Sequence, residues 1–503
     1  MADQPRDPVT LGSSSQSTID VAELAHALPD ARWWIRAAVV AGTISGLLML
    51  LRLDALSLNG DEGFTAQMVK LPWSAMLSDL TRIDYNMSLH YIVLKAWSGI
   101  FGTSEAALRF PSVIAALAAL PLLCRLVNRL FGPRLASLSV ILLALNPYFL
   151  RYALTARPYG FLILWSVVAT LALLSALSTE GRRRWLLYGL VAVVGLHIHL
   201  TALMVIGAHG LFTIFRQRRL SRLNLEALTV IAVVGLVPTF LFLAPTDTLN
   251  WIGPFTPSAA VHSAYALGGA FPFGWIVIGL AAVGIFSAPR PGDMRWLPAV
   301  WLTAPVAAYL ALAPYQSMFV DDYFAGVVAP CSILAAFGLD RLLGRVRNVA
   351  VPAALSIWTV ALAVTVLTGS LNHGQGWREL VPLMADRVEA GDAVAFPNAF
   401  FRIVVSYYSA DPLAGPFPPG NPVLPNNPWG AATAYQLDFI KRTGLQANHD
   451  VFEPEALAWE RIWVVGQGDR FDRALIEDLI SHGYIESAAA TSEGVFARLF
   501  TAG

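Results

Sequence analysis

Residues 33–64 read WWIRAAVVAGTISGLLMLLRLDALSLNGDEGF, an apolar run that is followed at once by a polar turn with two adjacent acids. A spanning helix needs about 20 mostly apolar residues, and Trp33 to Leu53 supplies them. Mixed polar residues precede this run and no small-residue cleavage pattern follows it, so we expect a retained anchor and not a cleaved signal. Residues 1–32 and the two acids would then lie on opposite sides of a membrane.

The composition of the whole chain also indicates a membrane protein, whose apolar surface is buried in lipid. Of 503 residues, 56% are hydrophobic and 14% are charged, whereas an ordinary soluble domain has about 25% charged residues. The 34 basic and 34 acidic residues cancel, so no overall field attracts nucleic acid. The only two cysteines, Cys124 and Cys331, lie in apolar stretches, which indicates small core residues and argues against a disulfide framework or thiolate metal site.

We predict about eleven membrane-spanning helices from the apolar runs. They lie near residues 33–53, 107–127, 135–153, 160–178, 185–199, 200–215, 226–244, 271–287, 297–315, 324–343 and 349–369. The basic clusters 182–184 and 216–219 flank the run 185–215, and the positive-inside rule places both clusters in the cytoplasm. That run must therefore cross the membrane and return.

The same rule orients the rest of the chain, because other arginine clusters fall at alternate connections. It predicts a cytoplasmic tail over 1–32, a transmembrane domain over 33–370 and an extracytoplasmic segment over 371–503, in the plasma (inner) membrane. The first outer loop, 54–106, has apolar residues at helical spacing, as in short helices that lie at the membrane interface. Alternating apolar runs and helix-like stretches in 371–503 predict a small α/β domain.

Asp61 and Glu62 are adjacent acids just beyond the first span, preceded by the turn-forming Asn59 and Gly60. A carboxylate close to the bilayer surface is suited to deprotonate an acceptor hydroxyl for sugar transfer from a lipid-linked donor. The neighbouring acid could orient that base or help to hold a divalent cation on a donor phosphate. The alternative is a solvated turn or a helix cap without catalytic function.

Four motifs extend this interpretation, in the order NGDEGF (59–64), DYNMSLHY (84–91), SEAALRFPS (104–112) and ARPY (156–159). In this order and approximate spacing they resemble the protein O-mannosyltransferase and aminoarabinose transferase superfamily, especially its bacterial Rgt-type branch. The resemblance covers roughly residues 33–370. It implies a C-type glycosyltransferase (GT-C) fold that takes a sugar from a polyprenyl phosphate and inverts the anomeric centre in one displacement.

The resemblance also implies roles for individual residues. Asp61 matches the loop acid of the family and becomes the general base, with Glu62 as its supporting acid. Arg157 lies at a predicted outer helix end, where a guanidinium could bind the donor phosphate bidentately, although it could also reach lipid headgroups. His199 matches a histidine that related transferases often carry and could bind the same phosphate, unless His197 and His199 are only polar packing.

Five further residues are candidates for contacts with the sugar or the acceptor. Tyr159 could stack on a sugar or a polyprenyl chain, or could belong to an interfacial aromatic belt. Asp322 could recognise acceptor hydroxyls or a cation, or could form a solvated turn. The complete set of substrate-binding candidates is Asn86, His90, Tyr159, Asp322 and Tyr323.

Three positions depart from the pattern of the relatives. Thr155 stands where relatives often have Glu, Asp322 precedes Tyr323 where many have Arg, and Asn86 with Met87 replaces a histidine followed by prolines. A metal site that uses an acid of the second outer loop is therefore not expected. A divalent cation, Mg²⁺ or Mn²⁺, at the donor phosphate is left open.

The expected partners are a polyprenyl-phosphate-linked sugar, membrane lipid, and an envelope glycan, glycolipid or protein as acceptor. Mannose is the most common sugar in related chemistry, but arabinose, galacturonic acid and aminoarabinose also occur, and the sequence does not select among them. The rival class is a transporter or flippase of envelope lipids or glycans, for which we would expect inverted repeats or broken helices. A noncatalytic assembly scaffold is a third reading, in which Asp61 would be replaceable.

Overall fold

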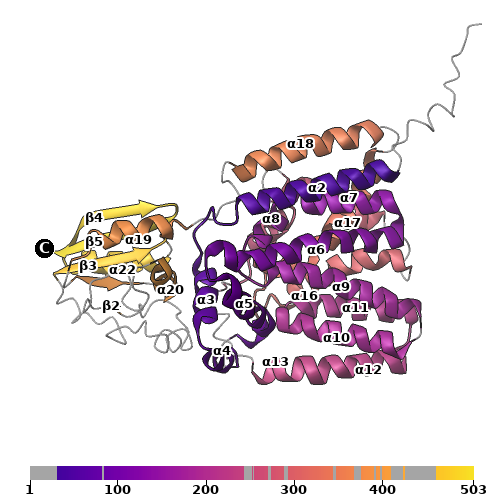
Figure 1. Cartoon of the computed structure of the whole chain (residues 1–503), viewed down its shortest axis with the longest axis horizontal. Coiled ribbons are helices and arrows are strands. Elements are labelled where there is room, and N and C mark those ends of the chain that lie inside the picture. Colours follow the sequence, from indigo (N-terminus) through magenta and orange to yellow (C-terminus); the bar gives the residue numbers. More distant parts are fainter. Residues whose placement is uncertain are drawn as a thin grey trace, which may run out of the picture.

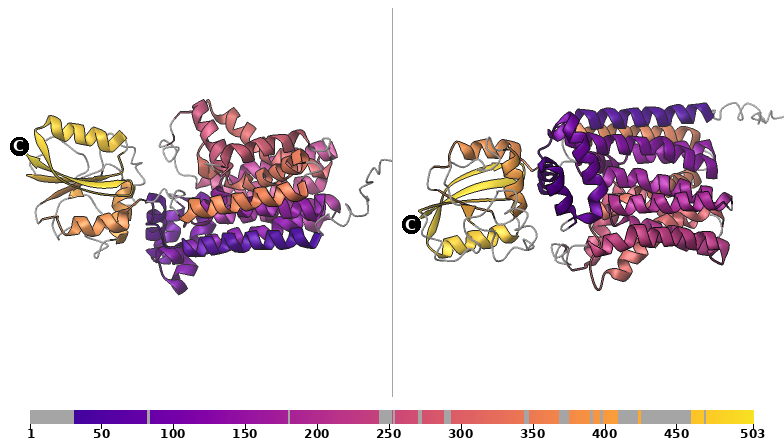
Figure 2. Two further views of the ribbon diagram at one scale, coloured as in Figure 1. Left: turned by 90° about the horizontal axis from the view of Figure 1, so that it is seen from above. Right: turned by 60° about the horizontal axis from the view of Figure 1, so that its bottom comes forward.

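A computed structural model describes residues 31–81, 84–179, 181–242, 252, 254–269, 273–287, 293–343, 347–367, 375–389, 392–396, 399–408, 423–424, 460–468 and 470–503. Helices form a long bundle, and a small domain with a β-sheet lies at one end of it (Figure 1). Short helices of the first outer loop lie between these two parts (Figure 2).

The helices of the bundle coincide with the predicted spans, except for the short helix Pro257–Leu267, which lies between two of them. They are α2 (Ala31–Leu51), α6 (Glu105–Phe131), α7 (Pro133–Ala144), α8 (Pro147–Ala153), α9 (Tyr159–Ser178), α10 (Arg182–Ile198), α11 (Ala202–Gln217), α12 (Arg222–Val230), η2 (Ile231–Leu236), α13 (Val237–Leu241), α14 (Pro257–Leu267), α15 (Gly274–Phe286), η4 (Met294–Trp296), α16 (Leu297–Leu312), η5 (Asp321–Val327), α17 (Val328–Leu343) and α18 (Arg347–Leu367). Within the described residues, five helices are long and apolar enough to cross a membrane alone. The number is six if the bent pair α7 and α8 is counted as one span. The chain is therefore multi-pass, and the number eleven stays a prediction.

The predicted span 135–153 is bent. Its two parts, α7 and α8, meet at 61°. Pro147 cannot continue the hydrogen-bond ladder of α7, and the side chain of Asn146 instead caps α8 by accepting a hydrogen bond from Tyr148 N. The bend brings the chain back into the bundle close to the ARPY motif.

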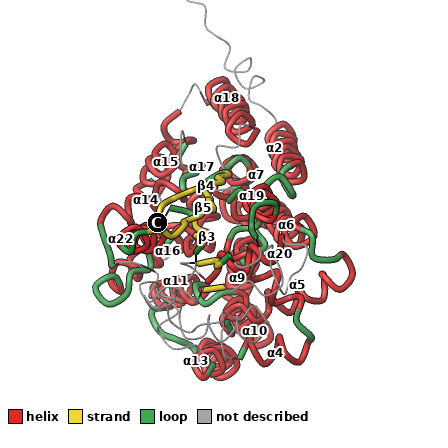
Figure 3. Tube along the Cα trace, turned by 90° about the vertical axis from the view of Figure 1, so that its left-hand side faces the viewer, coloured by secondary structure: helices red, strands yellow, loops and turns green. Residues whose placement is uncertain are grey.

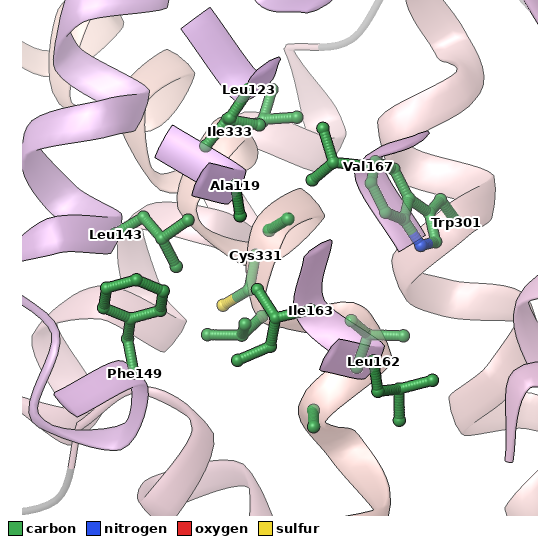
Figure 4. Packing of buried hydrophobic residues seen from close by; sticks show 14 of the residues in the cluster. Ala119, Leu123, Leu143, Phe149, Leu162, Ile163, Val167, Trp301, Cys331 and Ile333 are labelled. Carbon is green, nitrogen blue, oxygen red and sulfur yellow. The ribbon is translucent and has the colours of Figure 1, made fainter. Parts of the chain in front are cut away.

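The core of the bundle is apolar and closely packed. Cys331 is fully buried among aliphatic and aromatic side chains such as Leu143 and Ile163 (Figure 4). α15 and α17 touch backbone to backbone: a Cβ at Gly284 would lie 2.0 Å from Leu334 O, and one at Gly338 would lie 1.9 Å from Leu280 O. Small residues that allow such close approach are the usual means of helix packing in membranes.

The first outer loop forms the short helices that the sequence predicts. They are α3 (Gly60–Lys70), α4 (Trp73–Leu80), η1 (Tyr85–Met87) and α5 (Ser88–Phe101). Trp73 and Leu77 of α4 are almost half exposed, as expected for a helix that has an apolar face toward lipid. Seen from the side of the β-sheet, α4 and α5 lie at one edge of this end of the bundle, next to α10 (Figure 3).

The C-terminal domain is a small α/β fold. It contains α19 (Trp377–Ala385), β1 (Ala393–Ala395), α20 (Ala399–Tyr408), β2 (Val423–Leu424), β3 (Arg461–Gly466), α22 (Arg470–Ser481), β4 (Tyr484–Ser492) and β5 (Val495–Ala502). The strand order is β2-β1-β3-β5-β4, with β1 parallel to both neighbours and the β4–β5 hairpin antiparallel. Trp377 and Trp463 are fully buried, so both belong to the core and do not offer an open sugar-binding face.

Candidate active site

The two adjacent acids lie in the first turn of α3. The side chain of Asn59 accepts a hydrogen bond from Glu62 N (3.0 Å), and Glu62 Oε2 accepts one from Asn59 N (3.2 Å). This reciprocal capping satisfies two backbone donors that the helix start would leave free. It explains why the helix begins at Gly60 and fixes the directions of Asp61 and Glu62.

Glu62 is buried in an ion pair with Arg109 of α6. Arg109 Nε and Nη2 each donate to one carboxylate oxygen of Glu62, at 2.8 Å, and both side chains are at most 3% exposed. Ala156 N donates to the same carboxylate at 2.8 Å. Glu62 therefore connects α3 both to α6 and to the backbone next to Arg157.

The Asp61 side chain has a different environment, because it is open to solvent although protein groups surround it. This carboxylate is therefore accessible from outside while it lies among other charged groups. Burial raises the pKa of Asp61; the guanidinium of Arg157 lowers it, and the carboxylates of Asp322 and Glu62 raise it further. A carboxyl with a raised pKa accepts a proton more readily than an ordinary aspartate does.

Arg157 is buried close to Asp61 with one donor unused. Its Nη1 donates to Tyr91 Oη (3.2 Å), and the Tyr91 hydroxyl donates to Asp84 Oδ2 (2.7 Å). Arg157 Nε has no hydrogen-bond partner among the described residues, although the side chain is only 9% exposed. An unpaired buried donor is costly, so this guanidinium is suited to receive an anionic ligand.

Two neutral histidines lie close to Arg157. Burial, together with the positive charge of Arg157, lowers the pKa of His90 and of His199 to about 3. Thr201 N donates to His199 Nδ1 (3.2 Å), which leaves the ring proton on Nε2 as a donor. Neither ring nitrogen of His90 has a partner of normal hydrogen-bond geometry in the described part of the chain.

A cluster of tyrosine hydroxyls and a carboxylate completes the site. Tyr152 and Tyr159 each donate to one oxygen of Asp322, at 2.8 Å. The ring centroid of His199 lies 6.0 Å from that of Tyr159 and 5.7 Å from that of Tyr323. These residues come from α8, α9, the α10–α11 connection and η5, so the fold brings distant parts of the sequence to one place.

Most of the residues predicted from the sequence thus meet around Arg157. Asn86 lies on η1 near Asp84, and its buried Oδ1 has no partner among the described residues. His197 lies outside the cluster, with its ring against Tyr85 and its Nδ1 3.3 Å from Ser88 Oγ. The charge of Arg157 reaches five of the predicted residues, Asp61, His90, Tyr159, His199 and Tyr323, and Asp322 lies beside Tyr159 and Asp61.

Three residues of the site were not singled out from the sequence. Asp84 and Tyr91 lie in the quoted DYNMSLHY motif, and Arg109 lies in SEAALRFPS, so the motifs contained the signal. Burial raises the pKa of Asp84 to about 6, against the lowering effects of Arg157 and of the Tyr91 hydroxyl.

The described residues contain no group of three or more His, Cys, Asp or Glu side chains arranged for a metal ion, and the divalent cation stays a prediction.

Known proteins resemble this chain in sequence profile and in fold. Residues 89–242 match the profile of the dolichyl-phosphate-mannose-protein mannosyltransferase family. The structure of ArnT from Cupriavidus metallidurans bound to undecaprenyl phosphate is 14% identical, with a TM-score of 0.60 over 92% of this chain and 97% of that one. The apo oligosaccharyltransferase of Archaeoglobus fulgidus is 13% identical, with a TM-score of 0.54 over 93% of this chain and 74% of that one. No curated protein sequence matches the chain.

Proposed function

We propose that this chain, a member of the C-type glycosyltransferase superfamily by its fold and by its match over residues 89–242, moves a sugar from a polyprenyl phosphate to a cell-envelope acceptor. One observation carries the proposal. A buried guanidinium with an unused donor, Arg157, lies close to a solvent-accessible carboxylate, Asp61. Transfer from a phosphate-linked donor needs both groups, one for the phosphate and one for the acceptor proton.

These positions support the following reaction. Asp61 accepts the proton of the acceptor hydroxyl while the acceptor oxygen attacks the anomeric carbon. The bond between that carbon and the phosphate oxygen breaks on the opposite face, which inverts the anomeric centre. Arg157 and the Nε2–H of His199 stabilise the negative charge that develops on the leaving phosphate.

The remaining polar groups fit a sugar. Asp322 accepts from two tyrosine hydroxyls and keeps further lone pairs for sugar or acceptor hydroxyls. His90 and Asn86 have unpaired polar atoms on the side of the first outer loop. We assign these three residues, with Tyr159 and Tyr323, to substrate binding.

Mannose is our first candidate for the donor sugar. It is supported by the family that residues 89–242 match, and the acceptor would be an envelope glycan, a glycolipid or a protein. A lipid phosphate as the carrier agrees with the undecaprenyl phosphate bound to ArnT.

We also propose an orientation, with the N-terminus in the cytoplasm and the C-terminal domain outside it. α10 begins at the arginine cluster 182–184 and ends at the site, and α11 begins at the site and ends at the cluster 216–219. The basic ends therefore lie away from Asp61, as the positive-inside rule requires if the site faces outward.

The experiment that tests the function measures transfer of radiolabelled sugar from a panel of polyprenyl-phosphate donors to native acceptor membranes. Purified wild type is compared with Asp61→Asn and with the control Asp54→Asn, whose side chain is exposed in the connection before α3. We expect one donor to be active, activity to be lost in Asp61→Asn, and Asp54→Asn to resemble wild type.

Two results would contradict this proposal. Equal turnover by folded Asp61→Asn would remove Asp61 as the base. No turnover with any donor would favour the transporter or scaffold interpretation. A parallel reaction in EDTA tests the divalent cation, because loss of activity that Mg²⁺ or Mn²⁺ restores would establish the requirement.

A further inference from the structure

The C-terminal domain touches α3 directly behind the two acids. A Cβ on Gly63 would lie 2.3 Å from Val404 Cγ2 and 3.1 Å from Val404 Cα. α20 can therefore reach the backbone of α3 only because glycine follows Glu62. Further along the same pair of helices, Gln67 Nε2 donates to Ser406 Oγ at 3.0 Å inside the interface. The two helices lie side by side between the sheet and the bundle (Figures 1 and 2).

The same domain also holds the connection that leads from α2 into α3. Tyr408 Oη accepts a hydrogen bond from Leu58 N (2.6 Å) and donates to Glu105 at the start of α6. Arg378 N donates to Ser57 Oγ at 3.0 Å, and the Arg378 guanidinium forms an ion pair with Glu105. Glu105 is therefore the point on the bundle to which both Tyr408 and Arg378 attach.

Arg109 holds the other side of this connection. It lies one turn after Glu105 on α6 and donates to the carbonyls of Leu56 and Ser57 at 2.8 and 3.0 Å. The connection is thus held between α6 on one side and the C-terminal domain on the other. Asp61 follows Leu58 by three residues, so its position depends on both contacts.

We propose that the C-terminal domain sets the position of Asp61, with Tyr408 and Glu105 as positioning residues that act through Leu58 and α3. The inference rests on the proposed function, in which Asp61 is the base. A base must lie within hydrogen-bond reach of the proton that it takes, and a misplacement of about 1 Å can cost about 100-fold in rate. The donor-phosphate residues Arg157 and His199 lie outside α3 and keep their contacts with Tyr91 and Thr201.

Two neighbouring tyrosines of α20 provide a matched test. Tyr408→Phe removes the hydroxyl that holds Leu58 N and Glu105. Tyr407→Phe removes a hydroxyl that donates to Thr103 O (2.8 Å), in the connection before α6. Each variant loses one tyrosine hydroxyl at the same interface, and only the first one releases the segment that leads to Asp61.

We expect Tyr408→Phe to lower kcat about tenfold, with the donor KM unchanged, and Tyr407→Phe to stay within about twofold of wild type. Hydrogen–deuterium exchange is measured in the same samples, and residues 58–65 should exchange faster in Tyr408→Phe only. This second readout is independent of turnover and of whether the variant stays fully active.

The outcomes separate the two proposals. If wild type transfers no sugar from any donor, the proposed function fails, and exchange of residues 58–65 alone decides whether Tyr408 holds α3. Equal kcat and equal exchange in the two tyrosine variants would overturn the positioning role. A rise in donor KM without a fall in kcat would also overturn it, because that result would place Tyr408 in donor binding.

Discussion

The most demanding prediction concerns Arg109, because every N–H of its guanidinium is used. The five donors bind both oxygens of Glu62 and the carbonyls of Leu53, Leu56 and Ser57, at 2.8 to 3.2 Å. Lysine has three donors on one nitrogen, so Arg109→Lys keeps the charge but loses at least two of these five hydrogen bonds. A hydrogen bond contributes about 0.5 to 1.5 kcal/mol net, which gives a loss of about 1 to 3 kcal/mol.

The measurement is thermal unfolding in detergent, followed by tryptophan fluorescence. Arg129→Lys is the control, because Arg129 lies on the same helix, donates one bond to Ser178 Oγ and is exposed. We expect Arg109→Lys to melt well below wild type and to lose transferase activity, and Arg129→Lys to resemble wild type in both. If both variants melted at the temperature of wild type, the five-donor network would contribute nothing measurable and the reasoning would be refuted.

Two further predictions concern pH and orientation. Asp61 acts as a base only when ionised, and burial raises its pKa. The kcat of wild type should therefore fall with decreasing pH through a value above the usual pKa of 3.9 of an aspartate. Arg157→Gln removes the charge that lowers the pKa of Asp61 and should move this acid limb of the pH–rate profile to higher pH. A limb that stays in place in the variant would separate Arg157 from the base. In intact cells, a membrane-impermeant maleimide should label Ser481→Cys and leave Arg183→Cys unlabelled, and the reverse pattern would invert the proposed orientation.

Much of the bundle could be predicted because burial in lipid leaves a strong signal in the sequence. The runs 107–127 and 160–178 lie inside α6 and α9. Hydropathy did not predict the bend at Asn146, since the apolar run continues through it, nor α14 (Pro257–Leu267), which is too short to resemble a span. Both depend on local caps and on packing that a window of mean hydropathy does not detect.

The candidate site was predicted in part for a different reason. Asp61, Arg157 and His199 lie in motifs that resemble a known superfamily, and the structure brings them together. Their supports, Tyr91 and Arg109, are distant in sequence from the groups that they hold. No spacing rule relates Arg109 to Glu62, 47 residues away, so only the fold could reveal that contact.

The adjacent acids illustrate this limit, because sequence reasoning treated them as one functional pair. On a helix with 3.6 residues per turn, neighbouring side chains point about 100° apart and do not face each other. Asp61 can therefore stay exposed close to Arg157 only while Glu62 faces elsewhere, and here Glu62 faces Arg109 and Ala156 N. The bond to Ala156 N ties the base-bearing helix to the residue before Arg157, so we infer that Glu62 supports the reaction by fixing the distance between base and phosphate site.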